Sequence, residues 1–104
     1  MALTSLKASG SGITDNGLEF LNLKILDIND HKMITDVGIK HMQLTSLDAS
    51  WNSNITNQGI EHMNLVELSV QGCCGITNEG IKKMKLKKLN ALFNEKITDE
   101  GMMV

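Results

Sequence analysis

Residues 44–64, LTSLDASWNSNITNQGIEHMN, are followed directly by residues 65–85, LVELSVQGCCGITNEGIKKMK, and the two stretches repeat one another. Each opens with Leu, repeats Leu three residues later, and then carries Ile-Thr-Asn, Gly-Ile and Met in the same order. Aligned on the opening Leu, the repeat units begin at Leu3, Leu23, Leu44, Leu65 and Leu86. A period of this length indicates an array in which each unit buries its apolar face against its neighbours.

The whole chain has the length and composition of one ordinary soluble domain, and residues 1–104 are expected to form it. It has 104 residues, of which 41% are apolar and 21% charged, and its net charge of −2 gives no general attraction to nucleic acid or membranes. Neither a membrane-spanning run nor a signal peptide is recognised. Two adjacent cysteines, Cys73 and Cys74, cannot build a disulfide framework. A cytoplasmic location is therefore expected.

Each unit is expected to contain a short strand and a short helix. In Leu-x-x-Leu-x-aliphatic, the second Leu and the aliphatic residue alternate with polar residues, which is typical of a strand. The later Thr, followed by Asp or Asn, is typical of a helix N-cap. The next aliphatic residue and the closing Met are three apart, so they share one face of a short helix or 3-10 turn.

A glycine recurs in the expected helix of every unit. Its positions are Gly17, Gly38, Gly59, Gly80 and Gly101. Gly should weaken a helix by about 1 kcal/mol relative to Ala. Its recurrence indicates that adjacent coils approach too closely there for a Cβ.

Two motifs resemble those of leucine-rich repeats. The segments LTSLDASWN (44–52) and LVELSVQGC (65–73) are similar to the LxxLxLxxN and LxxLxLxxC halves of such repeats, and CCGITNEGIKKM resembles the cysteine-containing subtype of F-box leucine-rich repeat proteins. The resemblance covers residues 3–104 and implies an α/β fold, a right-handed solenoid of five units of about 21 residues. It implies a parallel β-sheet on the concave face and short helices or 3-10 turns on the convex face.

The Asn or Cys position of the motif is only partly kept. It is occupied by Ser11, His31, Asn52, Cys73 and Asn94. The asparagine ladder with which such repeats satisfy loop backbone is therefore expected to be partial.

The concave face is where such arrays usually bind, and its positions vary from unit to unit while the scaffold positions do not. The single Trp and one of the two Phe, Trp51 and Phe93, both fall at the eighth position of a unit. Two interpretations stay open: binding hot spots with an acidic rim that favours a basic partner, or lids over the strand ends. The predicted partner-binding residues are Asp27, Asn29, Asp30, Asp48, Ser50, Trp51, Glu67, Gln71 and Phe93.

No catalytic, metal-binding or cofactor-binding residue is predicted. His41 and His62 occupy the same position in successive units, but helix-bearing coils lie roughly 10 Å apart, too far for shared coordination at about 2 Å. For Cys73 a buried structural role is favoured over a nucleophile, and Cys74 is an exposed, oxidisable candidate. The run KKMKLKK at 82–88 is either a nucleic-acid or nuclear-localisation patch or a solvated edge, and the scaffold positions inside it favour the edge.

These patterns predict a non-enzymatic module that binds a protein partner on its concave face, with neither nucleic acid nor membrane as partner. No polar cap is recognised at either end, although solenoids need caps. One alternative is therefore a structural array that self-associates end to end into homo-oligomers. Another is substrate recognition in a ubiquitin-ligase-like assembly, which follows from the resemblance alone.

Overall fold

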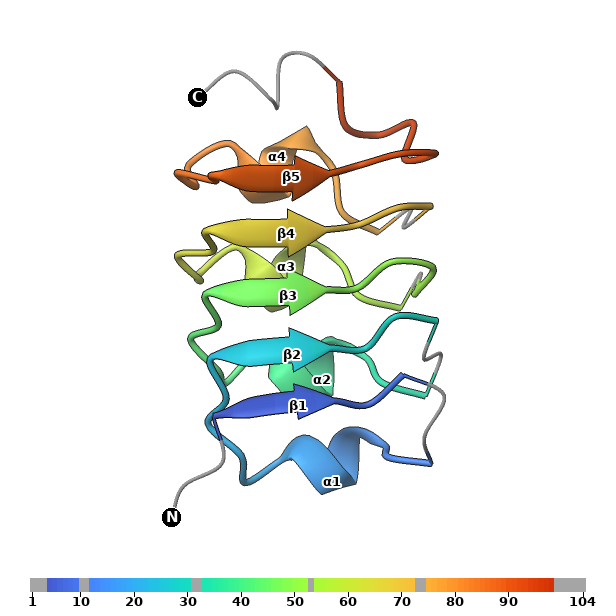
Figure 1. Ribbon diagram of the computed structural model, residues 1–104, viewed down its shortest axis with the longest axis vertical. Coiled ribbons are helices and arrows are strands. Elements are labelled where there is room, and N and C mark those ends of the chain that lie inside the picture. The colour runs from blue at the N-terminus through green and yellow to red at the C-terminus, as the bar shows by residue number, and fades with distance from the viewer. Residues whose placement is uncertain (1–3, 10–11, 31–32, 53, 73–74, 99–104) are drawn as a thin grey trace.

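The computed structural model describes residues 4–9, 12–30, 33–52, 54–72 and 75–98. Within these residues, strands and helices alternate along the chain (Figure 1). The strands are β1 (Ser5–Lys7), β2 (Ile25–Asp27), β3 (Ser46–Asp48), β4 (Glu67–Ser69) and β5 (Lys88–Asn90). The helices are α1 (Asp15–Leu18), α2 (Asp36–Ile39), α3 (Asn57–Ile60) and α4 (Asn78–Ile81).

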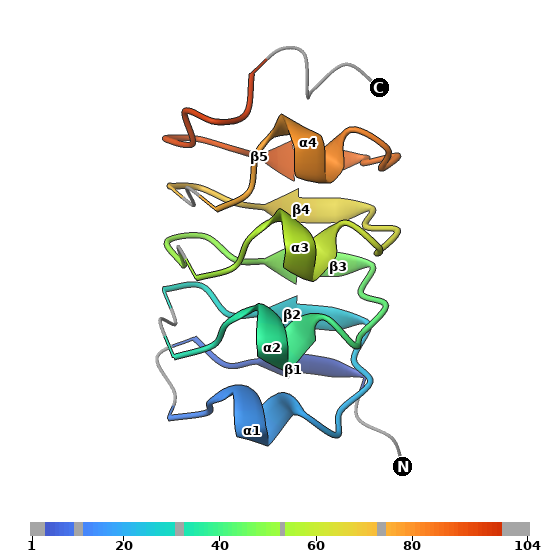
Figure 2. The same ribbon diagram turned by 180° about the vertical axis from the view of Figure 1, so that it is seen from behind.

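The strands form one parallel sheet in the order β1-β2-β3-β4-β5. The second Leu of every unit pairs with the same Leu of the next, so Leu26 lies beside Leu47 and Leu47 beside Leu68. The helices cover the other side of the molecule, and each coil winds right-handed from strand to helix to the next strand (Figures 1 and 2). The predicted right-handed α/β solenoid is confirmed.

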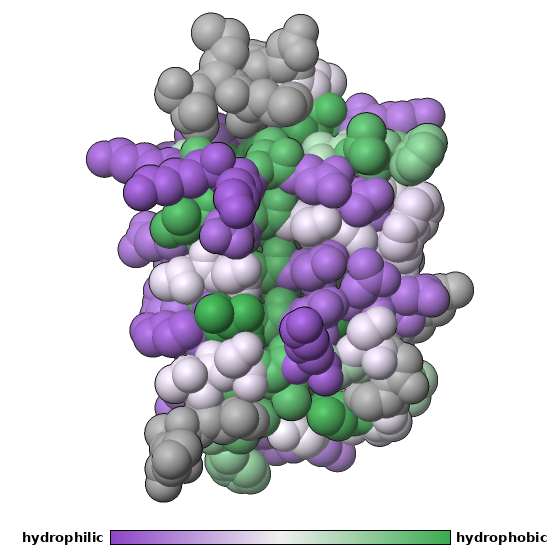
Figure 3. Space-filling view, viewed as in Figure 1, coloured by the Kyte–Doolittle hydropathy of each residue, from purple (hydrophilic) through white to green (hydrophobic). Residues whose placement is uncertain are grey.

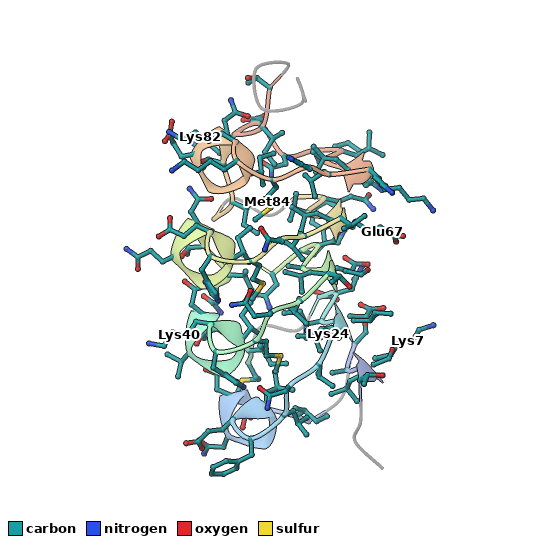
Figure 4. All side chains as sticks on the ribbon, turned by 90° about the vertical axis from the view of Figure 1, so that its left-hand side faces the viewer. Lys7, Lys24, Lys40, Glu67, Lys82 and Met84 are labelled. Atoms are coloured by element: carbon teal, nitrogen blue, oxygen red, sulfur yellow. The ribbon has the colours of Figure 1, made fainter. Side chains whose placement is uncertain are left out.

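The core lies between the sheet and the helices. Its members come from the scaffold columns of the repeat: a strand Leu such as Leu47, a helix Ile such as Ile60, and a closing Met such as Met63, all at most 2% exposed. Met84 occupies the same position in the next coil and lies between the two layers (Figure 4). Burial of each such side chain contributes about 1.5–3 kcal/mol. The coil is therefore held by neighbours rather than by its own four-residue helix, which would be marginal alone.

Each helix follows a Thr whose backbone is extended, as the N-cap prediction requires. Only two of these hydroxyls accept a hydrogen bond from their own helix: Thr35 from the Val37 N–H at 3.2 Å and Thr77 from the Glu79 N–H at 3.3 Å. The N–H and hydroxyl of Thr56 instead donate to Asp36 of the preceding coil. The Thr that precedes each helix therefore serves mainly to link neighbouring coils.

An inter-coil ladder runs along the helix side. The Thr35 N–H donates to Asp15 Oδ1 at 2.8 Å, and its hydroxyl donates to Asp15 Oδ2 at 2.6 Å. Thr56 makes the same two bonds to Asp36. The third rung has an amide, and the Asn57 side chain accepts from the Thr77 N–H and donates to its hydroxyl. The rung between Asn78 and Thr98 repeats that arrangement.

The ladder explains the recurring glycine. A Cβ on Gly59 would lie 2.2 Å from Asp36 Oδ1 and 2.7 Å from Asp36 Cγ. Gly38 and Gly80 face the corresponding side chains of Asp15 and Asn57 equally closely. The prediction that coils approach too closely for a Cβ is confirmed, because the ladder carboxylate or amide fills that space.

The asparagine ladder is present where the motif supplies Asn. The buried Asn52 side chain donates to the Ile34 carbonyl at 3.1 Å, and Asn94 donates to the carbonyls of Val70 and Ile76 at 3.2 Å each. Ser11, His31 and Cys73, the other residues of this column, lie outside the described residues, as does Cys74.

Candidate partner-binding surface

The outward side chains of β1–β5 form one face of the molecule, which we call the sheet face. Because the central Leu of each strand points into the core, the residues before and after it point outward. They make two rows: Ser5, Ile25, Ser46, Glu67 and Lys88, and then Lys7, Asp27, Asp48, Ser69 and Asn90. A shallow groove of about 420 Å³ is lined by members of both rows and by the strand leucines between them. Figure 3 shows the resulting apolar band between hydrophilic flanks.

Two predicted acids meet at the centre of this face. Asp27 and Asp48 lie directly opposite one another in β2 and β3, an arrangement that is unfavourable for like charges. Each accepts a hydrogen bond through Oδ1 from the N–H two residues on, that of Asn29 or Ser50, at 3.0 Å. The Asn29 amide also contacts Asp48 Oδ2 at 3.5 Å. The two carboxylates are thereby held in place, and their charge is concentrated on neighbouring strands.

Cations stand toward the two ends of the sheet face. Lys7 is the register partner of Asp27, and Lys88 is that of Glu67. Figure 4 shows Lys7 and Glu67 projecting from the sheet into solvent, on the opposite side of the molecule from Lys40 and Lys82. Among the described residues, the only ion pair within 4 Å joins Lys82 to Glu79, on the helix side. The acids of the sheet face are therefore not neutralised by an ion pair in the described chain.

One predicted contact residue needs correction. Ser50 is fully buried; its hydroxyl lies 2.9 Å from that of Ser69 and accepts from the Gln71 N–H at 3.0 Å. The strand ends at Asp48, so the alternation that would turn the seventh position outward stops before Ser50. Ser50 supports the surface from beneath and does not meet a partner. At the same position Asn29 and Gln71 are half-buried.

The eighth position lies beyond the strand, at the edge of the sheet face, and has a left-handed backbone. The φ angles are 56° at Asp30, 60° at Trp51, 62° at Gly72 and 61° at Phe93. The N–H groups of Asp30, Trp51 and Gly72 each donate to the carbonyl of the seventh residue of the next coil at 2.8–3.0 Å, so successive residues of this column lie side by side. Gly adopts this conformation freely and Asp tolerates it, whereas for a bulky side chain it is rare and costs about 1–2 kcal/mol.

The two aromatic side chains of this column form a pair, which we call the aromatic platform. The ring centroids of Trp51 and Phe93 are 6.0 Å apart with an interplanar angle of 36°. Gly72 lies between them in the column, and a Cβ there would come within 2.2 Å of the Trp51 ring. Trp51 stays 46% exposed and Phe93 76%, next to Leu92 at 62%. Trp51 therefore covers a neighbouring coil in part, as the lid interpretation expects, but the platform remains an open apolar surface.

The helix side carries polar residues with structural partners. A ring nitrogen of His41 lies 2.8 Å from the Leu21 carbonyl, and one of His62 lies 3.3 Å from the Met42 carbonyl. Since a carbonyl can only accept, each ring donates to the preceding coil. Among the described residues, no group of three or more His, Cys, Asp or Glu is placed to hold a metal ion.

The lysine-rich run 82–88 does not form one surface. Met84 inside it is buried and Leu86 is half-buried, as the scaffold alignment predicts. Lys82 pairs with Glu79 at 2.8 Å on the helix side, whereas Lys88 belongs to β5 and the sheet face. The hydrogen bond and charge of Lys82 lower the pKa of Glu79, and those of Glu79 raise the pKa of Lys82.

Sequence reasoning missed the left-handed column, although a signal was present. Gly10 and Gly72 occupy the eighth position in two units, and a Gly there indicates a positive φ. Ile25, at the same outward position of its unit as Ser5 and Ser46, is 48% exposed on the sheet face.

A family model described as Leucine Rich repeat matches residues 21–42 and 61–85 of the chain. No curated protein matches the sequence of the chain. The match and the five-stranded sheet agree on a leucine-rich repeat solenoid, without distinguishing the cysteine-containing subtype. Repeats of this family generally mediate protein–protein interaction and are typically non-enzymatic. Within the described part of the chain, no helix has the length and apolar character needed to cross a membrane.

Proposed function

We propose that this leucine-rich repeat chain is a protein-binding module whose partner docks on the sheet face and on the aromatic platform at its edge. The observation that carries the proposal is the exposure of Trp51 and Phe93 at positions where the backbone favours Gly. Large aromatic side chains are enriched among the residues that dominate binding energy. The left-handed backbone costs each of these residues free energy while its ring stays exposed, and this points to a role outside folding.

The surface is already ordered before a partner arrives. The platform residue Trp51 is fixed through its N–H to the Gln71 carbonyl, and the Asp27 and Asp48 carboxylates through backbone N–H groups. A partner that binds there orders little of this chain, so more of the contact energy appears as affinity. The buried Ser50 hydroxyl contributes to the same rigidity from below.

A partner with basic character suits this surface. Asp27, Asp48 and Glu67 are outward residues of the sheet face, and Asp30 stands in the same column as Trp51. Complementary charge raises the association rate and selects among partners more than it raises affinity. The cytoplasmic location expected from the sequence remains part of this proposal.

The test is affinity capture from native lysate with two variants of matched design. Trp51→Ala combined with Asp48→Lys removes a ring and reverses a charge on the proposed surface. Phe20→Ala combined with Glu61→Lys makes the same kinds of change at exposed residues outside it. A specific partner retained by the wild type and the control, and lost by the first variant, is expected. Equal retention by both variants would contradict the proposal, with circular dichroism confirming that both are folded.

A second candidate function is end-to-end assembly. The strand leucines Leu6 and Leu89 of the outermost described strands are only half-buried, in contrast to 2% exposure at Leu47. A second copy stacked on β1 or β5 would cover them and satisfy the backbone of an edge strand. Light scattering over a concentration series tests it, and a monomer at all concentrations would rule it out.

A further inference from the structure

The eighth-position column places a carboxylate and two aromatic rings in sequence along one edge of the sheet. Asp30 donates its N–H to the Ser50 carbonyl, so its backbone lies against the residue that precedes Trp51. Trp51 in turn leans over Gly72 toward Phe93. The order along the edge is therefore a carboxylate, an indole ring, a glycine and a phenyl ring.

The Asp30 carboxylate is not neutralised by any described side chain. Asp30 is exposed, and within the described residues no side-chain hydrogen bond or ion pair is found for it. The Asp48 carboxylate of the next coil adds a second negative charge three residues before Trp51. An occupant of this edge must therefore present a cation to the acids and an apolar or planar surface to the rings.

We propose that the aromatic platform of Trp51 and Phe93, with the carboxylates of Asp30 and Asp48, binds an arginine side chain in a basic segment of the protein partner. This inference rests on the proposed protein-binding function and names the chemistry of the partner.

Arginine meets both requirements better than other side chains. Its guanidinium is planar, stacks on aromatic faces and presents a fork of donors to carboxylates, whereas the lysine ammonium is a strongly hydrated point charge. A purely apolar partner would leave the Asp30 and Asp48 charges unpaired at the interface, which is unfavourable. Charge and shape together therefore select arginine over lysine and over neutral side chains.

The protein carries its own reporter for this test, because Trp51 is the only Trp in the chain. Its fluorescence is titrated at low salt with hexaarginine, hexalysine and hexacitrulline, the last being uncharged but close to arginine in shape. We expect a saturable change with hexaarginine, at least threefold weaker binding of hexalysine, and no binding of hexacitrulline. Equal affinity for hexaarginine and hexalysine would overturn the proposal, and so would the absence of a saturable change.

Two pairs of variants locate the site. Phe93→Gly should weaken hexaarginine binding about threefold, whereas Phe20→Gly, at an exposed Phe in the first coil, should not. Asp30→Asn should weaken it about twofold and reduce its salt dependence, whereas Glu19→Gln at an exposed helix-side acid should not. Glycine and asparagine both tolerate a positive φ, so both site variants should fold. Equal affinities within each pair would overturn the proposal.

The outcome of the peptide titration can be distinguished from that of the capture experiment. If a captured partner depends on Trp51 and Asp48 but hexaarginine neither binds nor displaces it, the protein-binding function stands and the arginine site is wrong. If hexaarginine binds as expected and also displaces the partner, both hold. If no partner depends on Trp51 and Asp48, the proposed function fails whatever hexaarginine does.

Discussion

Two positions of the repeat favour glycine, but only one of them is occupied by glycine throughout. On the helix side, the position occupied by Gly38, Gly59 and Gly80 faces a ladder side chain of the preceding coil and is always Gly. At the edge of the sheet face, the left-handed eighth position is Gly at 72 but Trp51 and Phe93 in the coils on either side. The first column follows the needs of folding. The second departs from them where the rings are exposed, and the departure marks the surface that we propose for binding.

The largest effect is expected from Gly59→Ala, which would break the helix-side column. In an ordinary helix this substitution stabilises by about 1 kcal/mol. Here the new Cβ would meet Asp36 Oδ1 at 2.2 Å, and displacing Asp36 would cost both of its hydrogen bonds to Thr56. We expect the free energy of unfolding to fall by about 2–4 kcal/mol, measured by urea denaturation.

The matched control is Gly17→Ala in the first coil. Among the described residues, a Cβ there meets Ile13 Cγ2 alone, at 3.2 Å. We expect this variant to be neutral or more stable by up to about 1 kcal/mol. Similar destabilisation of both variants would show that the ladder does not explain the column.

A smaller effect is expected from Gly72→Ala, which makes the eighth position of this coil resemble that of its neighbours. The left-handed backbone costs Ala about 1–2 kcal/mol, and the Cβ would lie 2.2 Å from the Trp51 ring. In a Trp51→Ala background only the backbone part should remain. The coupling between the two substitutions, about 1 kcal/mol in a double-mutant cycle, measures how firmly the ring is seated. A coupling of zero would mean that the ring moves aside freely.

Phe93→Gly should change stability in the opposite direction. It relieves about 1 kcal/mol of backbone strain and loses little burial, since Phe93 is 76% exposed. Thermal unfolding should show an equal or higher midpoint together with weaker partner binding. A clearly lower midpoint would show that Phe93 is a structural lid, and the contrast between the two columns would disappear.

The smallest effect is expected from Lys82→Gln on the helix side. Its exposed pair with Glu79 holds the pKa of Glu79 below its usual value, so the variant should raise that pKa toward the ordinary range. A lowered folded-state pKa contributes stability above the unfolded-state pKa, and this is lost as pH falls through the folded-state value. Because both groups are fully exposed, solvent screens the pair. NMR titration of Glu79 checks the pKa shift, and a large change in the unfolding midpoint at neutral pH would contradict this account.

The fold could be predicted because the residues that form the core are the ones that define the repeat. The strand Leu, the helix Ile and the closing Met occur at fixed positions, and each is buried. The close approach at Gly59 was also predicted, although its cause was not. The partner, Asp36, lies in the preceding coil, and its carboxylate reads in the sequence only as a helix-start residue.

The candidate site could be predicted only in part. Aromatic type and unit position identified Trp51 and Phe93, but their left-handed backbone depends on where the strand ends. The same early end of β3 buried Ser50, which simple alternation would expose. Because the strands are only three residues long, period-two reasoning fails beyond the sixth position of each unit. How far a side chain is exposed there depends on the loop, which the repeat pattern does not encode.

The inter-coil ladder has a consequence for how such a chain changes in length. Each of the three coils that carry α2, α3 and α4 brings both halves of the joint: a side chain such as Asp36 that reaches forward, and the Thr and Gly that receive the one before it. Asp15 and Asn57 both serve as the reaching group, because each accepts from the Thr N–H. Any of these three coils can therefore follow another through this joint. Duplication or loss of one whole unit leaves every remaining joint complete, whereas an insertion of any other length breaks one.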